Sequence, residues 1–161
     1  MTPEQTQALI GHLSQLVTPA RLAKMTAVLQ RRTRRVAVVL EDVYAIESTN
    51  PFEPSRAVTR GAERWLSVQG YPDAAACVTV LRDRGYQLVA MSPQADSYTL
   101  PQLPLGPKLA IAFGSELWGL SPALREAADL QARIPMAGFT ESFNLSVSVA
   151  ICLYELTQRL R

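Results

Sequence analysis

Two short segments combine glycine with polar side chains at the end of an apolar run. In the first, the run at residues 109–113 ends at Gly114, and Glu116 follows shortly after it. A glycine at a strand end lets a ligand or another backbone come close, and the Glu116 carboxylate can accept hydrogen bonds. A plain strand-to-helix turn capped by Ser121 would use the same residues. Both readings predict that a strand ends at residue 113.

The second segment joins a short apolar run to a long amphipathic stretch. Ile134-Pro135-Met136 is followed by a loop, and Ser142 and Asn144 precede the stretch that reaches residue 160. A helix N-terminus presents unpaired N–H groups that favour polar or anionic ligands. An N-cap role would by itself account for Asn144. The segment therefore indicates either a binding loop or a capped helix.

Apolar patterns around these segments predict an α/β fold, a parallel sheet with helices on both faces. In the last helix, Val147, Ile151 and Tyr154 form one stripe, which we expect to face inward. Residues 92–107 contain four prolines and predict a loop. Residues 57–69 predict a short helix or turn that leads into a strand. Strands are expected at 35–40, 86–91, 109–113 and 132–135, and helices at 4–16, from 19, at 73–84, 121–130 and 144–160.

Length and composition fit one globular domain, because the chain has 161 residues, 48% hydrophobic and 19% charged. Its apolar runs are too short to span a membrane, and the N-terminus does not have the pattern of a secretory signal. Cys77 and Cys152 lie in apolar, helix-like contexts, which favours reduced thiols in a cytoplasmic protein over a disulfide. A single histidine, His12, argues against zinc sites that need two histidines and against a Ser-His-Asp triad.

The net charge of +2 hides a basic N-terminal segment. A basic segment on a near-neutral body suggests a polyanion such as RNA, although a solvated helix face would explain it equally well. We therefore expect a basic helical extension at residues 1–34 and a second domain at 35–161. The residues expected to contact RNA phosphates are Arg31, Arg32, Arg34 and Arg35.

The junction at Tyr44-Ala45 conflicts with a parallel sheet. An apolar stretch at residues 44–46 follows the strand at 35–40 within a few residues, whereas a parallel crossover needs a dozen or more. Either residues have been deleted here, or a segment of the protein is missing from the numbering. We favour the missing segment, because deletion of a covering helix would expose apolar surface at a cost of several kcal/mol.

Together, the two segments resemble the SpoU branch of the SPOUT RNA methyltransferases, and most closely the TrmH-like tRNA guanosine 2′-O-methyltransferases. The second motif of that family, FGxExxGLS, is found at residues 113–121. Its third motif, IPMxGxxxSxNxSxAxxxxxYE, is found at residues 134–155 with slight variation at 147–150. The resemblance covers residues 36–160.

The resemblance implies a homodimer with a C-terminal trefoil knot, no metal, and S-adenosylmethionine bound in the knot. It implies that Glu116, Ser142 and Asn144 serve the reaction by shaping the cofactor and ribose pocket. The ribose 2′-hydroxyl would attack the methyl group in line, and a nearby base, not identified by the sequence, would take the proton. The implied cofactor contacts are Ala90, Met91, Ser92, Gly114, Ile134, Met136, Phe143 and Asn144.

The family's first motif is absent after Tyr44, together with about twenty residues. This motif contains an arginine that is thought to activate the ribose hydroxyl. Two hypotheses stay open: an RNA 2′-O-methyltransferase acting on a tRNA guanosine, and a non-catalytic RNA-binding protein of the same fold. A generic nucleotide-binding domain is a weaker third, because the chain has no GxGxxG loop. The sequence does not distinguish tRNA from ribosomal RNA.

Overall fold

The computed structural model describes residues 1–30, 33–41, 66–96 and 98–160. It divides into two compact units, Met1–Arg34 and Arg35–Arg161. Arg31, Arg32, the Tyr44-Ala45 junction and most of the element expected at 57–69 lie outside the described residues. None of the helices that the structure describes has the length and apolar character needed to cross a membrane.

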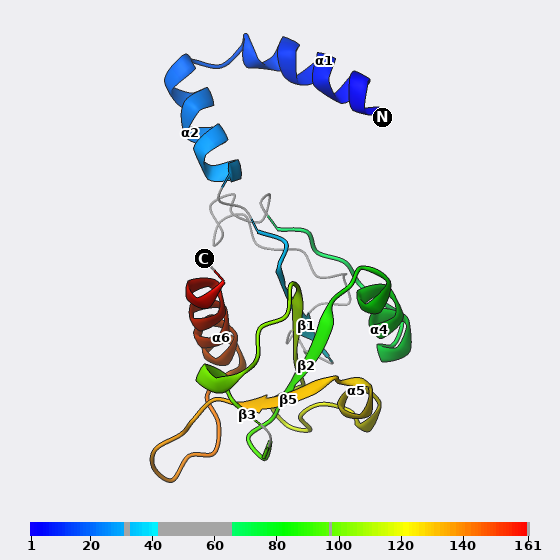
Figure 1. Ribbon diagram of the computed structural model, residues 1–161, viewed down its shortest axis with the longest axis vertical. Coiled ribbons are helices and arrows are strands. Elements are labelled where there is room, and N and C mark those ends of the chain that lie inside the picture. The colour runs from blue at the N-terminus through cyan, green and yellow to red at the C-terminus, as the bar shows by residue number, and fades with distance from the viewer. Residues whose placement is uncertain (31–32, 42–65, 97, 161) are drawn as a thin grey trace. The chain divides into compact units, whose positions relative to one another are not determined.

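The first unit consists of the helices α1 (Pro3–Ser14) and α2 (Pro19–Gln30) (Figure 1). Thr2 and Gln5 form a capping box that starts α1, with hydrogen bonds of 2.9 and 3.2 Å. Neither helix has a buried residue within the unit. Both helices predicted in this part of the chain are therefore present, with their apolar side chains not buried by the unit itself.

The second unit is built on a parallel sheet with the strand order β1-β4-β2-β5-β3. Its strands are β1 (Val36–Leu40), β2 (Gln87–Met91), β3 (Tyr98–Thr99), β4 (Leu109–Phe113) and β5 (Leu130–Arg133). The strand β3 and a 3-10 turn, η2 (Leu100–Gln102), lie in the stretch predicted to be loop. The prediction missed β3 because a two-residue edge strand carries no period of its own.

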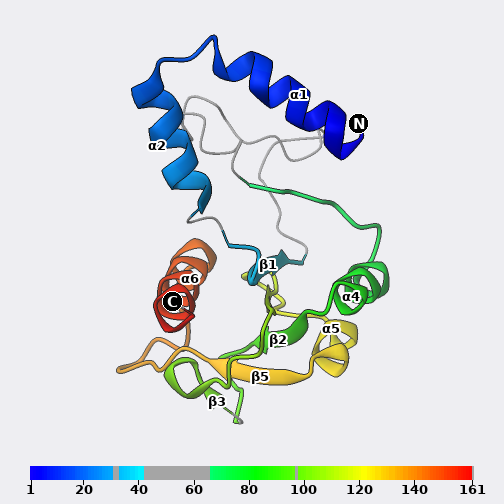
Figure 2. The same cartoon turned by 45° about the horizontal axis from the view of Figure 1, so that its top comes forward.

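Helices cover both faces of this sheet (Figure 2). Val89 and Met91 on β2 pack in a core cluster with α6 (Leu145–Arg159), whereas Leu88 and Ala90 pack in the opposite cluster. That second cluster contains residues of α4 (Ala74–Asp83) and α5 (Pro122–Ala127). Successive side chains of a strand point to opposite faces, so the alternation of clusters confirms the predicted α/β layers.

The inward stripe predicted for the last helix is wrong at Val147 and Tyr154, whereas Ile151 packs against the core cluster as expected. Cys152 and Leu156 are the buried residues of α6, whereas Val147 and Tyr154 are 44% and 68% exposed. The helix is turned so that the neighbouring apolar row faces the sheet, and sequence periodicity could not choose between two adjacent apolar rows. The described residues consequently leave Val147 and Tyr154 exposed on α6.

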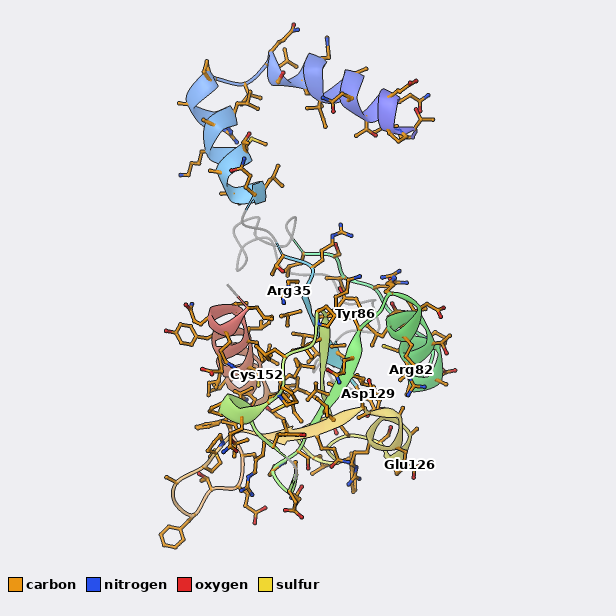
Figure 3. All side chains as sticks on the ribbon, in the orientation of Figure 1. Arg35, Arg82, Tyr86, Glu126, Asp129 and Cys152 are labelled. Carbon is orange, nitrogen blue, oxygen red and sulfur yellow. The ribbon has the colours of Figure 1, made fainter. Side chains whose placement is uncertain are left out.

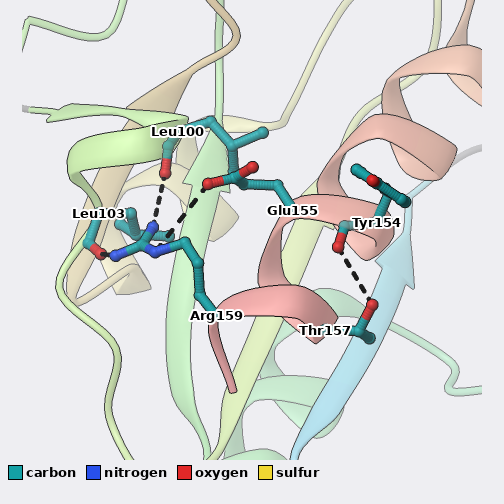
Figure 4. Close-up of polar contacts among 6 residues, drawn as sticks. All are labelled: Leu100, Leu103, Tyr154, Glu155, Thr157 and Arg159. Atoms are coloured by element: carbon teal, nitrogen blue, oxygen red, sulfur yellow. Dashed lines mark hydrogen bonds and ion pairs between the residues drawn. The ribbon is translucent and has the colours of Figure 1, made fainter. Parts of the chain in front are cut away.

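Arginines fix the C-terminal end of α6. Arg159 donates hydrogen bonds of 3.0 and 2.7 Å to the carbonyls of Leu100 and Leu103, and its Nε lies 4.0 Å from the Glu155 carboxylate (Figure 4). Arg35 donates to the Leu160 carbonyl at 2.9 Å. These bonds tie the end of the last helix to the η2 turn and to the residue that precedes β1.

Candidate functional site

The two motif segments meet at the N-terminus of α6. Asn144 caps this helix, and its Oδ1 accepts hydrogen bonds from the Ser146 N–H at 2.9 Å and the Ser146 hydroxyl at 2.7 Å. The Asn144 side-chain amide donates to Glu116 Oε1 at 2.8 Å, and the Leu145 N–H also points to this oxygen at 3.4 Å. Glu116 thus fixes the orientation of the Asn144 side chain and places a negative charge at the helix N-terminus, where it is favoured.

A pocket of about 70 Å³ lies beside this helix start. Because β2, β4 and β5 are parallel, their carboxyl ends meet at one edge of the sheet, where open α/β sheets bind ligands. The start of α6 supplies the remaining wall. The described residues that line the pocket are Met91, Ser92, Pro93, Phe113, Ile134, Met136, Ser142, Phe143 and Ser148.

Most of the implied cofactor contacts are therefore brought together. The pocket contains Met91, Ser92, Ile134, Met136 and Phe143, together with Ser142 from the implied reaction residues. The family resemblance implied these positions, and the parallel sheet brings them together because the carboxyl ends of adjacent parallel strands share an edge.

Ala90, Gly114 and Asn144, the other implied contacts, are not among the residues that line this pocket. The Ala90 side chain is fully buried in the cluster on the opposite face of the sheet. A Cβ atom at Gly114 would overlap the backbone of Gly119 and Leu120. Gly114 thus permits a close approach of the chain's own backbone, which is the second of the two uses that glycine could have at this strand end.

The pocket is apolar with hydroxyl groups, and no charged side chain lines it among the described residues. The Ser92 hydroxyl already donates to Gln94 Oε1 at 2.9 Å. Within the part of the chain that the structure describes, the Ser148 hydroxyl has only a long contact of 3.5 Å to the Phe143 carbonyl. Such a site suits a largely neutral ligand that offers apolar surface and a few hydrogen-bonding atoms.

Three lining residues were missed by the sequence reasoning: Pro93, Phe113 and Ser148. Phe113 ends β4, and its side chain points to the same face of the sheet as that of Met91. Strand alternation could therefore have predicted that Phe113 lies beside Met91. Ser148 lies one helical turn beyond Asn144, and helix geometry places such residues on the same face. Only its position next to Ser92 in the sequence could have indicated that Pro93 lines the pocket.

The basic residues expected to bind RNA do not all lie in the same unit of the structure. Arg35 belongs to the second unit, where its Nε donates to the Pro107 carbonyl at 3.1 Å and its Nη1 donates to the Leu160 carbonyl at 2.9 Å (Figure 3). These bonds give Arg35 a structural role that a charge pattern cannot reveal. Arg34 is exposed in the first unit, and Arg31 and Arg32 lie outside the described residues.

Comparisons with known proteins identify the family of this chain. A family model described as "SpoU rRNA Methylase family" matches residues 32–154. A tRNA (guanosine(18)-2'-O)-methyltransferase of Borreliella burgdorferi is 37% identical over 173 aligned positions, covering 94% of this chain and 79% of the relative. The alignment is longer than the 161 residues of this chain, so the relative contains residues that have no counterpart here.

Solved structures share the fold. The A. aeolicus TrmH/SpoU tRNA modifying enzyme has a TM-score of 0.74 at 23% identity, covering 86% of this chain and 82% of its own. The SpoU methyltransferase AviRb from Streptomyces viridochromogenes in complex with AdoMet has a TM-score of 0.61 at 24% identity, covering 77% and 49%. The family model spans most of the chain and includes both motif segments of the site, so this protein belongs to the SpoU methylase family.

Proposed function

We propose that this chain is an S-adenosylmethionine-dependent RNA 2′-O-ribose methyltransferase that acts on a tRNA guanosine. The observation that carries the proposal is the 2.8 Å bond between Asn144 and Glu116, which joins the second and third motifs beside the pocket. The tRNA substrate is supported by the Borreliella burgdorferi relative, whose alignment covers 94% of this chain.

The pocket residues fit such a cofactor. Met91, Ile134 and Met136 offer apolar surface to the nucleoside and thioether parts, and serine hydroxyls offer hydrogen bonds. S-adenosylmethionine supplies an activated methyl group, which the ribose 2′-oxygen accepts as that oxygen loses its proton. The protein's part is to exclude water from the apolar wall and to hold the reacting groups in line.

Glu116, Ser142 and Asn144 would shape the side of the pocket that the ribose approaches. Glu116 holds the Asn144 amide through its acceptor oxygen, so Asn144 is a positioned group and not a freely rotating one. Ser142 lines the pocket and precedes the helix cap. The reaction needs a further group to take the ribose proton, and we expect it in the segment that follows Tyr44 in the family.

We also propose the family's trefoil knot and a homodimer. The bonds from Arg159 to Leu100 and Leu103 support the knot, because they bind the last helix to the connection between β2 and β4. The exposed Val147 and Tyr154 support the dimer, because a second copy would cover an apolar stripe that this chain leaves open. An RNA substrate and two buried free thiols suit the cytoplasm.

The longer alignment to the Borreliella burgdorferi relative supports the absence of residues from this sequence, and we place that absence after Tyr44. An intact-mass measurement of the protein from its native source would separate the two accounts. A mass equal to the 17.7 kDa of this chain indicates a deletion, whereas a larger mass indicates a missing segment.

The activity test uses the purified chain, isotope-labelled S-adenosylmethionine and bulk tRNA. We expect label in the tRNA, and we expect the labelled linkage to resist alkaline hydrolysis because a methylated 2′-oxygen cannot attack the phosphate. Asn144→Ala should remove most of the incorporation. Binding of tRNA and cofactor without any incorporation would identify the chain as a non-catalytic RNA-binding member of the family.

A further inference from the structure

The Ser148 hydroxyl is a polar group of the pocket to which the activity proposed above gives no specific role. Ser148 lies on α6, lines the pocket, and is neither fully buried nor exposed. The third motif has alanine at this position, so the hydroxyl is a feature of this chain. A serine hydroxyl can donate one hydrogen bond and accept others, and its only contact among the described residues is the 3.5 Å approach to the Phe143 carbonyl.

The hydroxyl groups of Ser146 and Ser92 are already engaged. The Ser146 hydroxyl is held by Asn144 Oδ1 at 2.7 Å, and Ser92 donates to Gln94 at 2.9 Å. A 3.5 Å contact is at the weak limit of hydrogen-bond geometry, so the Ser148 hydroxyl can turn toward a ligand at little cost. Ser148 thus contributes hydrogen-bonding capacity to the helix side of the pocket.

The negative charge at the helix start disfavours the carboxylate group of the cofactor at this wall. The Glu116 carboxylate accepts from the Asn144 amide and the Leu145 N–H, so a negative charge already occupies the N-terminus of α6. A second carboxylate would be repelled there, and no cation lines the pocket among the described residues to offset it. The adenosine part of S-adenosylmethionine is uncharged and carries both donors and acceptors.

Resting on the proposed function, we infer that the Ser148 hydroxyl hydrogen-bonds the adenosine part of the bound cofactor and sets part of its affinity. The test measures binding of S-adenosylhomocysteine and of 5′-methylthioadenosine by calorimetry. The first ligand carries the amino-acid group and the second lacks it. Ser148→Ala should weaken both by a similar factor of about five, as expected for one hydrogen bond.

Thr157→Val is the matched control, because Thr157 lies on the same helix and is also half-buried. Its hydroxyl donates to the Leu153 carbonyl at 2.7 Å and also lies 3.1 Å from the Tyr154 carbonyl, a contact drawn in Figure 4. This variant should bind both ligands as the wild type does. Equal affinities for Ser148→Ala and wild type, or a loss confined to S-adenosylhomocysteine, would overturn the inference. Failure of the wild type to bind either ligand would instead count against the proposed function.

Discussion

The Glu41 carboxylate holds Ser121 through two short hydrogen bonds, from the Ser121 hydroxyl at 2.6 Å and from its backbone N–H at 2.7 Å. The Ser121 hydroxyl in turn accepts the Leu124 N–H at 3.2 Å and caps α5. Glu41 follows β1 directly, and its own N–H bonds to the Phe113 carbonyl at 3.0 Å. The end of β1 is therefore bonded both to the end of β4 and to the last residue of the second motif.

Glu41→Ala should destabilise the second unit, because it removes the acceptor for both Ser121 donors. Hydrogen bonds to a charged group contribute about 1.5–3 kcal/mol, and we expect a loss of that order in the free energy of unfolding. Urea denaturation measures it. Glu126→Ala is the control, since Glu126 is exposed on α5 (Figure 3). Equal losses for the two variants would mean that the Glu41 bonds do not stabilise the unit.

Gly114→Ala should mainly lower the stability of the second unit, and its effect on ligand binding should be secondary. The added Cβ would overlap the backbone of Gly119 and Leu120, so the loop must move at a cost of about 1–3 kcal/mol. Gly70→Ala is a suitable control, since a Cβ there meets nothing within 4 Å. Thermal melting of both variants checks this. If Gly114→Ala left the melting temperature unchanged but weakened cofactor binding, the result would indicate that Gly114 contacts the cofactor.

Substitution of Arg35 should mainly lower stability, whereas substitution of its basic neighbours should mainly weaken RNA binding. Arg35→Ala removes the bonds to Pro107 and Leu160 and should lower the melting temperature. Reversal of Arg31, Arg32 and Arg34 to glutamate should weaken tRNA binding, and wild-type affinity should fall steeply with salt as phosphate contacts require. Filter binding at several salt concentrations, with melting curves for each variant, distinguishes these effects. A salt-independent affinity would contradict the phosphate contacts.

Stability should decrease in alkaline solution because of Cys152. Burial raises the pKa of the Cys152 thiol from 9.0 to about 12. Above pH 9 the unfolded thiol loses its proton while the folded thiol keeps it, so the unfolded state binds fewer protons and stability falls as pH rises. Denaturation experiments at pH 8 and pH 10.5 should show that the free energy of unfolding decreases less for Cys152→Ala than for the wild type. The difference should be about 1 kcal/mol for each pH unit above 9. Parallel decreases would show that another group causes the effect.

The exposed stripe on α6 should be a contact between two copies of the chain. Tyr154→Glu places a charge where Tyr154 is 68% exposed, and we expect light scattering to show a shift from dimer to monomer at micromolar concentration. Thr79→Glu on the exposed side of α4 is the comparison and should leave the dimer intact. A wild-type protein that is already monomeric would remove the dimer proposal.

Sequence reasoning located the elements whose apolar period or cap is strong. The strand β4 and the Asn144 cap of α6 were found this way, because an unbroken apolar run and an N-cap residue each have a direct physical cause. The two-residue β3 and the rotation of α6 were not found, because both depend on packing between distant residues. The structural bonds of Arg35 were not found for the same reason, because its partners at Pro107 and Leu160 are distant in the sequence.

The pocket wall includes Ser142 and Ser148, which follow every strand of the sheet in the chain. Since synthesis proceeds from the N-terminus, the ribosome releases β1 through β5 before the residues that complete this wall. A small molecule held by the finished pocket can therefore not guide the assembly of the strands during translation. It can stabilise the unit only after these residues have been synthesised, by mass action on the folded state.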